Sequence, residues 1–192
     1  MAFGAVLDAC VLIPMSLCDV LLRAAQRDLY RAHWSDMILD EVERNLPNLG
    51  ISPEKARRRV EAMRRAFDRA AVEGFEGIID RMPNHPKDRH VLAAAVVAGA
   101  QSIVTFNRKD FRTEGTAQGH IRAEDPDTFL SNLFHLHPDS LTDIIVGQAA
   151  KLEKGGRVWT PDEVLDGLAR QGCGCFADLV RERLRRRTIT PP

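Results

Sequence analysis

The sequence is poor in several residue classes that mark specialised proteins. Aromatic residues make up only 6% of its 192 residues, too few for a protein that holds single-stranded nucleic acid mainly by stacking. Four cysteines are too few for a disulfide-dense secreted scaffold. No apolar run approaches the ~20 residues that span a bilayer, and the first residues lack the basic start of a signal peptide. We therefore expect a cytoplasmic protein with no membrane partner.

A net charge is also missing, because 27 Lys and Arg balance 27 Asp and Glu. This balance excludes a uniformly basic protein that coats nucleic acid by bulk attraction. Positive charges outnumber negative ones in two segments. Residues 54–73 contain seven basic and four acidic side chains, and residues 181–187 contain five Arg and one Glu. Clustered Arg suits contacts to phosphate groups, and it equally suits a solvated helix face. With 44% hydrophobic residues the chain can bury a substantial core.

Short apolar segments alternate with amphipathic ones along the first two thirds of the chain. The expected strands are Phe3–Leu7, Arg31–Trp34, Ile78–Ile79, Ser102–Thr105 and Arg122–Ala123. Alternating strands and helices predict a parallel sheet with right-handed crossovers and helices on both faces. In such sheets ligands bind beyond the carboxyl ends of the strands.

Capping residues and apolar stripes predict where the helices begin and end. Ser16 and Ser35 are expected to cap helices, the first of which runs to about Gln26. Pro53 opens a long helix whose apolar stripe extends to Ala71 and which Gly74 closes. Asp88 begins an alanine-rich helix, and Gly99 fits its left-handed C-terminal cap. Pro126 opens the last helix of the α/β part.

The composition changes after His137-Pro138. Three amphipathic helices are expected there, over residues 141–150, 161–169 and 176–184, and no further strand. We therefore expect two domains: an α/β domain over residues 1–137 and a small all-helical extension over residues 138–192.

Three carboxylates stand where the predicted fold makes them informative. Asp8 lies at the carboxyl end of an apolar strand, where an unpaired charge is costly unless it binds a metal, caps a helix or meets a buried Arg. Asp88 is a candidate metal ligand or an ordinary helix cap. Glu41 lies beside the apolar Ile38/Val42 face of its helix, and it is either a residue of the site or a solvated surface Glu. Asp36 and Asp40 on the same helix are alternative candidates for the site residue.

A fourth polar segment, Thr105-Phe-Asn-Arg-Lys-Asp110, follows the fourth strand candidate. Asn107 and Asp110 reach the same edge of the sheet as Asp8, or else they cap a turn. Together, these groups suit phosphodiester hydrolysis by bound divalent ions, since Mg²⁺ takes oxygen ligands from carboxylates, water and substrate phosphate.

The segments LDACVLI, SDMILDEV, HPKDRHVLAAAVVAGAQSIVTFNRKDF and DPDTFL resemble the PIN-domain nucleases, and more narrowly the VapC-type toxin ribonucleases of bacterial toxin–antitoxin systems. The resemblance covers about residues 3–134 and implies a three-layer α/β/α sandwich around a parallel sheet. It carries the acidic site over to Asp8, Glu41 and Asp88 as metal ligands for Mg²⁺ or Mn²⁺. Asn107 stands where many of these proteins have Asp, which shifts part of the ligation toward Asp110.

The resemblance also implies an RNA substrate, a cognate antitoxin and a homodimer. Asp8, Glu41, Asp88 and Asn107 are then the expected catalytic residues, and Asp110 joins the metal ligands. Thr105, Arg58 and Arg65 are the expected substrate contacts, and His85 and His90, which flank Asp88, are further candidates for such contacts. Two other interpretations stay open: a PIN scaffold that binds RNA or protein without cutting, and an RNA-processing nuclease without an antitoxin.

Overall fold

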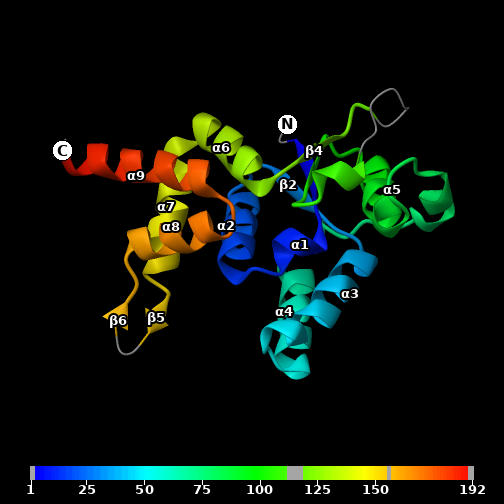
Figure 1. The fold of residues 1–192 in the computed structure, drawn as a ribbon, viewed down its shortest axis with the longest axis horizontal. Coiled ribbons are helices and arrows are strands. Elements are labelled where there is room, and N and C mark those ends of the chain that lie inside the picture. The colour runs from blue at the N-terminus through cyan, green and yellow to red at the C-terminus, as the bar shows by residue number, and fades with distance from the viewer. Residues whose placement is uncertain (1–2, 112–118, 155–156, 190–192) are drawn as a thin grey trace. The chain divides into compact units, whose positions relative to one another are not determined.

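The computed structural model describes residues 3–111, 119–154 and 157–189. Its contacts divide the chain into two compact units (Figure 1). The first unit comprises residues 1–13 and 30–125, and the second comprises residues 14–29 and 126–192. The predicted boundary at residue 138 falls inside the second unit, and residues 14–29 join that unit from an early part of the sequence. The division of the chain into domains over residues 1–137 and 138–192 stays a prediction.

The first unit is built on a four-stranded parallel sheet in the order β2-β1-β3-β4. The strands are β1 (Gly4–Leu7), β2 (Arg31–His33), β3 (Ser102–Val104) and β4 (Arg122–Glu124). Its helices are α1 (Ala9–Leu12), α3 (Asp36–Asn45), α4 (Pro53–Ala66) and α5 (Arg89–Ala98). Strands β1 and β3 are buried throughout, which is typical of the centre of a parallel sheet covered on both faces. The expected three-layer α/β/α class is confirmed.

Several predicted helix ends are confirmed in this unit. The Ser35 hydroxyl accepts a hydrogen bond from the Ile38 amide and caps α3. Gly99 ends α5 in the left-handed conformation, with φ of 60°. Short 3₁₀ helices follow α3 at Leu46–Leu49, precede α5 at Pro86–Asp88 and follow β3 at Arg108–Phe111.

The region between α4 and α5 differs from the prediction. Helix α4 ends at Ala66, not near Gly74, because Phe67 leaves the helical conformation and packs edge-on against Trp34 at a ring distance of 5.6 Å. Ala71 then forms an isolated parallel bridge with Trp34 at the edge of the sheet. The strand expected at Ile78–Ile79 is wrong, since these residues lie in a 3₁₀ helix, Glu76–Arg81. The short apolar pair fits a one-turn helix as well as it fits a strand.

The second unit is mainly helical. It contains α2 (Met15–Gln26), α6 (Pro126–Leu136), α7 (Pro138–Ala149), α8 (Pro161–Arg170) and α9 (Gly174–Ile189). Helix α2 begins at Met15 after Pro14, so Ser16 is not its cap. A two-stranded antiparallel ladder, β5 (Glu153–Lys154) with β6 (Arg157–Val158), was not expected in this part. None of the helices in the described ranges is both long and apolar enough to cross a bilayer.

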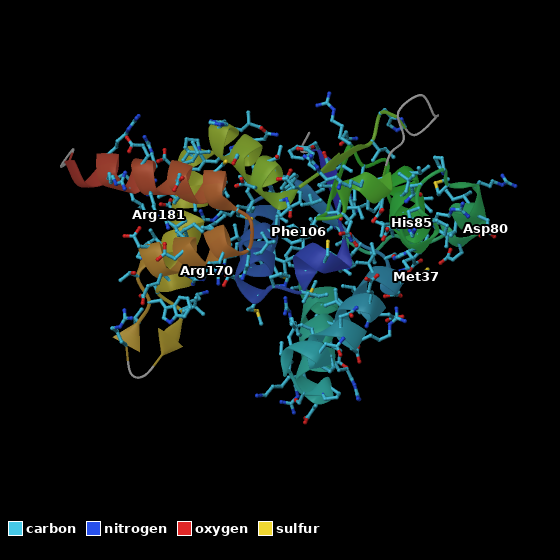
Figure 2. The ribbon with its side chains drawn as sticks, viewed as in Figure 1. Met37, Asp80, His85, Phe106, Arg170 and Arg181 are labelled. Carbon is cyan, nitrogen blue, oxygen red and sulfur yellow. The ribbon has the colours of Figure 1, made fainter. Side chains whose placement is uncertain are left out.

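Helix α9 is held to the rest of the second unit by carboxylates. Asp127 accepts hydrogen bonds from the amides of Cys175 and Phe176 and so caps the start of α9. Arg187 pairs with Asp139 at 2.6 Å and with Asp143 at 2.7 Å. Other pairs join Arg183 to Asp139, and Arg181, marked in Figure 2, to Asp162, Asp166 and Asp178. The basic C-terminal segment is therefore largely neutralised within its own unit.

Candidate active site

Two strand ends meet at the centre of the sheet. Leu7 of β1 and Val104 of β3 are partners in the parallel ladder, and the amide of Asp8 donates to the Val104 carbonyl at 3.1 Å. Asp8 and Thr105, the next residues of the two segments, are therefore neighbours. Both are buried, with exposed fractions of 3% and 0%. The prediction that these strand ends converge at one edge is confirmed.

Asp8 is held by side chains and not by a helix amide or a cation. Its Oδ2 atom accepts hydrogen bonds from the Thr105 hydroxyl at 2.6 Å and from the Cys10 thiol at 3.2 Å. It stands at the N-cap position of α1, yet its side chain makes no capping bond. Within the described ranges no Arg or Lys pairs with it. Among the described residues, Asp8 therefore neither caps a helix nor pairs with a buried Arg. Its second carboxylate oxygen, Oδ1, remains available to bind a ligand.

Cys10 and Thr105 fix the geometry around Asp8. The Thr105 hydroxyl accepts from the Asn107 amide at 3.0 Å, and the Cys10 sulfur accepts from the Phe106 amide at 3.3 Å. Burial, followed by the charge of Asp8, raises the pKa of the Cys10 thiol to about 12. The thiol therefore stays protonated at neutral pH and acts as a donor to Asp8. Thr105 has no exposed surface and donates to Asp8, and its role as a substrate contact stays a prediction.

Glu41 faces this centre from α3. Ser35 caps the helix and Ile38, Leu39 and Val42 bury its inner face, which leaves Glu41 partly exposed next to the sheet edge. Burial and the charge of Asp8 raise the pKa of the Glu41 carboxyl. The competing residues Asp36 and Asp40 are exposed and pair with Arg64 instead. Glu41 is therefore the acid that this helix contributes.

Asp88 reaches the same place from the start of α5. It occupies the N-cap position without making a capping hydrogen bond, so its carboxylate is not used by the helix. Burial raises the pKa of this carboxyl, and the charges of Asp8, Asp110 and Glu41 raise it further. Four acids from four segments therefore lie within electrostatic range of one another. Repulsion of this kind is costly for a folded chain unless a cation offsets it.

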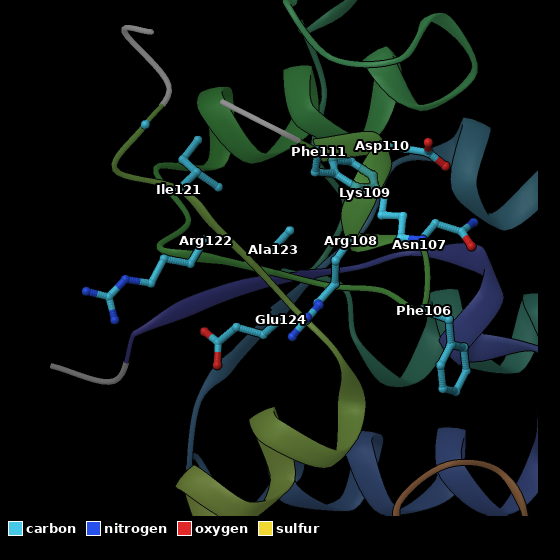
Figure 3. Close-up of a pocket in the computed structure, with 11 residues that line it drawn as sticks. Phe106, Asn107, Arg108, Lys109, Asp110, Phe111, Ile121, Arg122, Ala123 and Glu124 are labelled. Carbon is cyan, nitrogen blue, oxygen red and sulfur yellow. The ribbon is translucent and has the colours of Figure 1, made fainter. Parts of the chain in front are cut away.

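A pocket of about 500 Å³ is lined by three of these acids, Glu41, Asp88 and Asp110, whereas the buried Asp8 does not line it. Its lining residues are Glu41, His85, Lys87, Asp88, Asn107 and Asp110. Figure 3 is a close-up of a different pocket, which shares Asn107 and Asp110 with this one, and it shows these two side chains on the side of the loop away from Arg122 and Glu124. Donor atoms of His85, Asp88 and Asp110 lie within 4.8 Å of one another, which is close enough for one ion. Lys87, which directly precedes Asp88, is not predicted from the sequence, and His85, three residues before Asp88, is predicted only as a substrate contact.

The donors present suit a divalent cation. Carboxylate and amide oxygens are the ligands that Mg²⁺ and Mn²⁺ take in proteins. A buried nitrogen supplies a second indication: His90 Nε2 has no hydrogen-bond partner among the described residues and lies 3.9 Å from Oε2 of Glu41. An orphaned buried nitrogen beside a carboxylate indicates that a further polar species completes the site.

Arg58 and Arg65 lie outside this pocket. Both are strongly exposed on α4 and each faces an acid one turn earlier, Arg58 with Glu54 at 2.5 Å and Arg65 with Glu61 at 3.9 Å. A third Arg of this helix, Arg59, donates to the carbonyls of Leu12 and Ile13 and so ties α4 to the C-terminal end of α1. A role of Arg58 and Arg65 in substrate binding stays a prediction.

The sheet, the convergent acids and the sequence all agree with one family. A model described as PIN domain matches residues 4–109, more than half of the chain, and the chain belongs to the PIN-domain family. A second model, described as VapC50 C-terminal domain, matches residues 126–182. Together the two matches identify the chain as VapC-type within that family.

Among characterised sequences, the chain is similar to the putative ribonuclease VapC50 of Mycobacterium tuberculosis (strain ATCC 25618 / H37Rv). The two are 38% identical over 99 residues. This alignment covers 51% of the present chain and 57% of the relative, so the likeness extends over little more than half of either. No solved structure matches the chain at a significant level.

Proposed function

We propose that the chain is a divalent-metal-dependent endoribonuclease and the toxin of a type II toxin–antitoxin pair. The observation that carries this proposal is the convergence of Asp8, Glu41, Asp88 and Asp110. Among the described residues none of these four acids forms an ion pair with an Arg or a Lys, and the basic side chains closest to Glu41 and Asp88 are the imidazoles of His90 and His85. Such uncompensated acids at the carboxyl edge of a parallel sheet fit metal-assisted phosphodiester hydrolysis.

Each residue has a distinct role in the proposed site. Asp8 presents Oδ1 as a ligand because Oδ2 is saturated by Thr105 and Cys10. Asp88 would be the second direct ligand, Glu41 would orient the attacking water, and Asn107 and Asp110 would complete the set of ligands. When bound, Mg²⁺ or Mn²⁺ activates water as the nucleophile and neutralises charge on the phosphate and the leaving oxygen.

RNA is the proposed substrate, as the name of the similar ribonuclease suggests. Lys87 lines the acidic pocket and supplies a positive charge where the substrate backbone enters. Arg58 and Arg65 on α4 are proposed to hold more distant phosphates. A cognate antitoxin that blocks the pocket, a homodimeric assembly and a cytoplasmic location complete the proposal.

The test is cleavage of RNA by the purified chain, freed from any antitoxin. We expect cleavage with Mg²⁺ or Mn²⁺, arrest by EDTA, and loss of cleavage in the Asp8→Asn/Asp88→Asn double variant. Circular dichroism of that variant checks that it is folded. Full cleavage by the folded double variant would overturn the assignment of the site.

The antitoxin is tested separately. Co-expression with the product of a small open reading frame beside the gene should suppress both the toxicity and the RNA cleavage of the chain. An unaltered cleavage rate in the presence of every neighbouring gene product would favour an RNA-processing nuclease without an antitoxin.

A further inference from the structure

The acidic pocket contains an imidazole that the acidic site described above does not use. His85 lies just before the 3₁₀ turn Pro86–Asp88, and its amide donates to the Asp110 carbonyl at 3.0 Å. This bond ties the His85 loop to the segment that carries Asp110. Through it, the backbone brings His85 to the pocket together with Asp88 and Asp110.

The distances suit a shared ion. Ligand atoms of one octahedral ion at ~2.1 Å stand roughly 3 to 4.2 Å from one another. His85 Nδ1 lies 4.0 Å from Oδ2 of Asp88, inside that range. With the Asp110 carboxylate included, the three donor atoms are within 4.8 Å of one another. Small side-chain adjustments would bring all three donor atoms to the separations that one octahedral ion requires.

Little opposes a metal bond to His85. Its Nδ1 accepts only a long hydrogen bond of 3.4 Å from the Lys87 amide, and its side chain is 49% exposed. An exchange of that weak bond for a metal bond therefore costs little. The ring is not enclosed by core residues that would fix it in another orientation.

A second imidazole, that of His90, lies beside Glu41 in a neighbouring pocket. His90 is 8% exposed, and its Nε2 atom has no hydrogen-bond partner among the residues that the structure describes. This nitrogen lies 3.9 Å from Oε2 of Glu41, which lines both this neighbouring pocket and the acidic pocket, whereas His90 does not line the acidic pocket. The distance is too long for a direct hydrogen bond and leaves room for a bound species between them.

We propose that His85 is a nitrogen ligand of the metal in this site, joined with Asp88 and Asp110, and that it shifts the preference of the site from Mg²⁺ toward first-row transition ions such as Mn²⁺. The inference deepens the proposed function and rests on it. Imidazole binds transition ions well, whereas Mg²⁺ favours oxygen and water. An all-oxygen shell would instead leave His85 free to contact substrate phosphate.

The direct test is pulsed electron paramagnetic resonance of Mn²⁺ bound to the full chain, which detects hyperfine coupling to a coordinated imidazole nitrogen. We expect this coupling in the wild type and in His90→Gln, and its loss in His85→Gln. His137→Gln in the second unit is the matched control and should retain it. Gln keeps an oxygen donor, so the ion stays bound while the nitrogen signal disappears.

Competition between Mn²⁺ and Mg²⁺ gives the second readout. The ratio of Mn²⁺ to Mg²⁺ affinity should fall about tenfold in His85→Gln and stay unchanged in His137→Gln. Nitrogen coupling that survives in His85→Gln, or that disappears only in His90→Gln, would overturn the assignment of His85.

The two proposals fail in different ways. If wild type binds Mn²⁺ without nitrogen coupling, and the Asp8→Asn/Asp88→Asn variant does not bind it, the His85 inference fails and the nuclease proposal stands. If that double variant binds Mn²⁺ as tightly as wild type does, the proposed site is wrong and the His85 inference fails with it.

Discussion

Acidic side chains have different neighbours in the two compact units. In the second unit, Asp139 meets Arg183 and Arg187, and hydrogen bonds from these two Arg lower the pKa of its carboxyl. In the first unit, Asp88 has no Arg or Lys ion-paired with it among the described residues, and burial, followed by the charges of Asp8 and Asp110, raises the pKa of its carboxyl. A chain with equal numbers of acids and bases thus contains one region of paired charges and one region of unpaired acids. Only the second kind of region calls for a cation from outside.

The largest expected effect is on cleavage. Asp88→Asn removes a ligand and should reduce the RNA cleavage rate about a hundred- to thousandfold. Asp139→Asn makes the same chemical change in the region of paired charges and should leave the rate unchanged. Single-turnover cleavage of both variants measures this difference. Equal losses in the two variants would show that the contrast between the regions has no functional meaning.

The next effect concerns the support of Asp8. Thr105→Val removes the hydroxyl that donates to Oδ2 at 2.6 Å and keeps the shape of the buried side chain. We expect a ten- to hundredfold loss of activity, roughly the cost of removing an outer-shell partner of a metal ligand. Thr105→Ser, which retains the donor, should restore most of the rate. Identical kcat values for the Ser and Val variants would argue against a positioning role.

The sequence predicts some residues of the candidate site and does not predict others. The sequence predicts Asp8 and Thr105 because each directly follows a buried strand, and the parallel order of β1 and β3 then makes them neighbours. The role of His85 is not visible in the same way. It depends on a loop without periodicity and on a backbone hydrogen bond to Asp110, 25 residues away in the sequence.

The errors have a common physical origin in tertiary contacts. The apolar stripe that predicts a helix as far as Ala71 is interrupted because Phe67 packs on Trp34 and Ala71 bridges the sheet edge. The pairing of Arg187 with Asp139 and Asp143 spans more than forty residues. Local spacing describes neither contact, so a basic segment that suggests nucleic-acid binding is instead part of an internal network.

A smaller effect is expected on the stability of the metal-free protein. The pKa values of Asp88 and Glu41 in the folded protein lie above their values in the unfolded chain. These two carboxyls therefore stabilise the folded protein while they are protonated, below about pH 4. This contribution is lost as the pH rises through the raised pKa values. Asp88→Asn removes one repelled charge and should raise Tm by about 2 °C near neutral pH. The gain should shrink as the pH falls toward about pH 4, because the carboxyl of wild-type Asp88 takes up a proton over that range. A thermal scan across that pH range in EDTA checks this, and a gain that grows as the pH falls would contradict it.

The smallest effect is expected in the region of paired charges. Arg187→Gln breaks exposed ion pairs with Asp139 and Asp143 and should lower Tm by about 2 °C or less, because exposed pairs contribute little. The difference should shrink further in high salt. RNA cleavage should not change. A large loss of RNA binding in this variant would mean that the C-terminal Arg residues contact substrate.

The central claim is that the unpaired acids of the first unit form a cation site. Calorimetric titration of Mn²⁺ into the metal-free chain tests it most directly, with Asp8→Asn/Asp88→Asn as the test variant and Asp139→Asn as the matched control. We predict equal affinities for wild type and Asp139→Asn, and binding about a hundredfold weaker or more in the double variant. Undiminished Mn²⁺ binding by the folded double variant would contradict the claim.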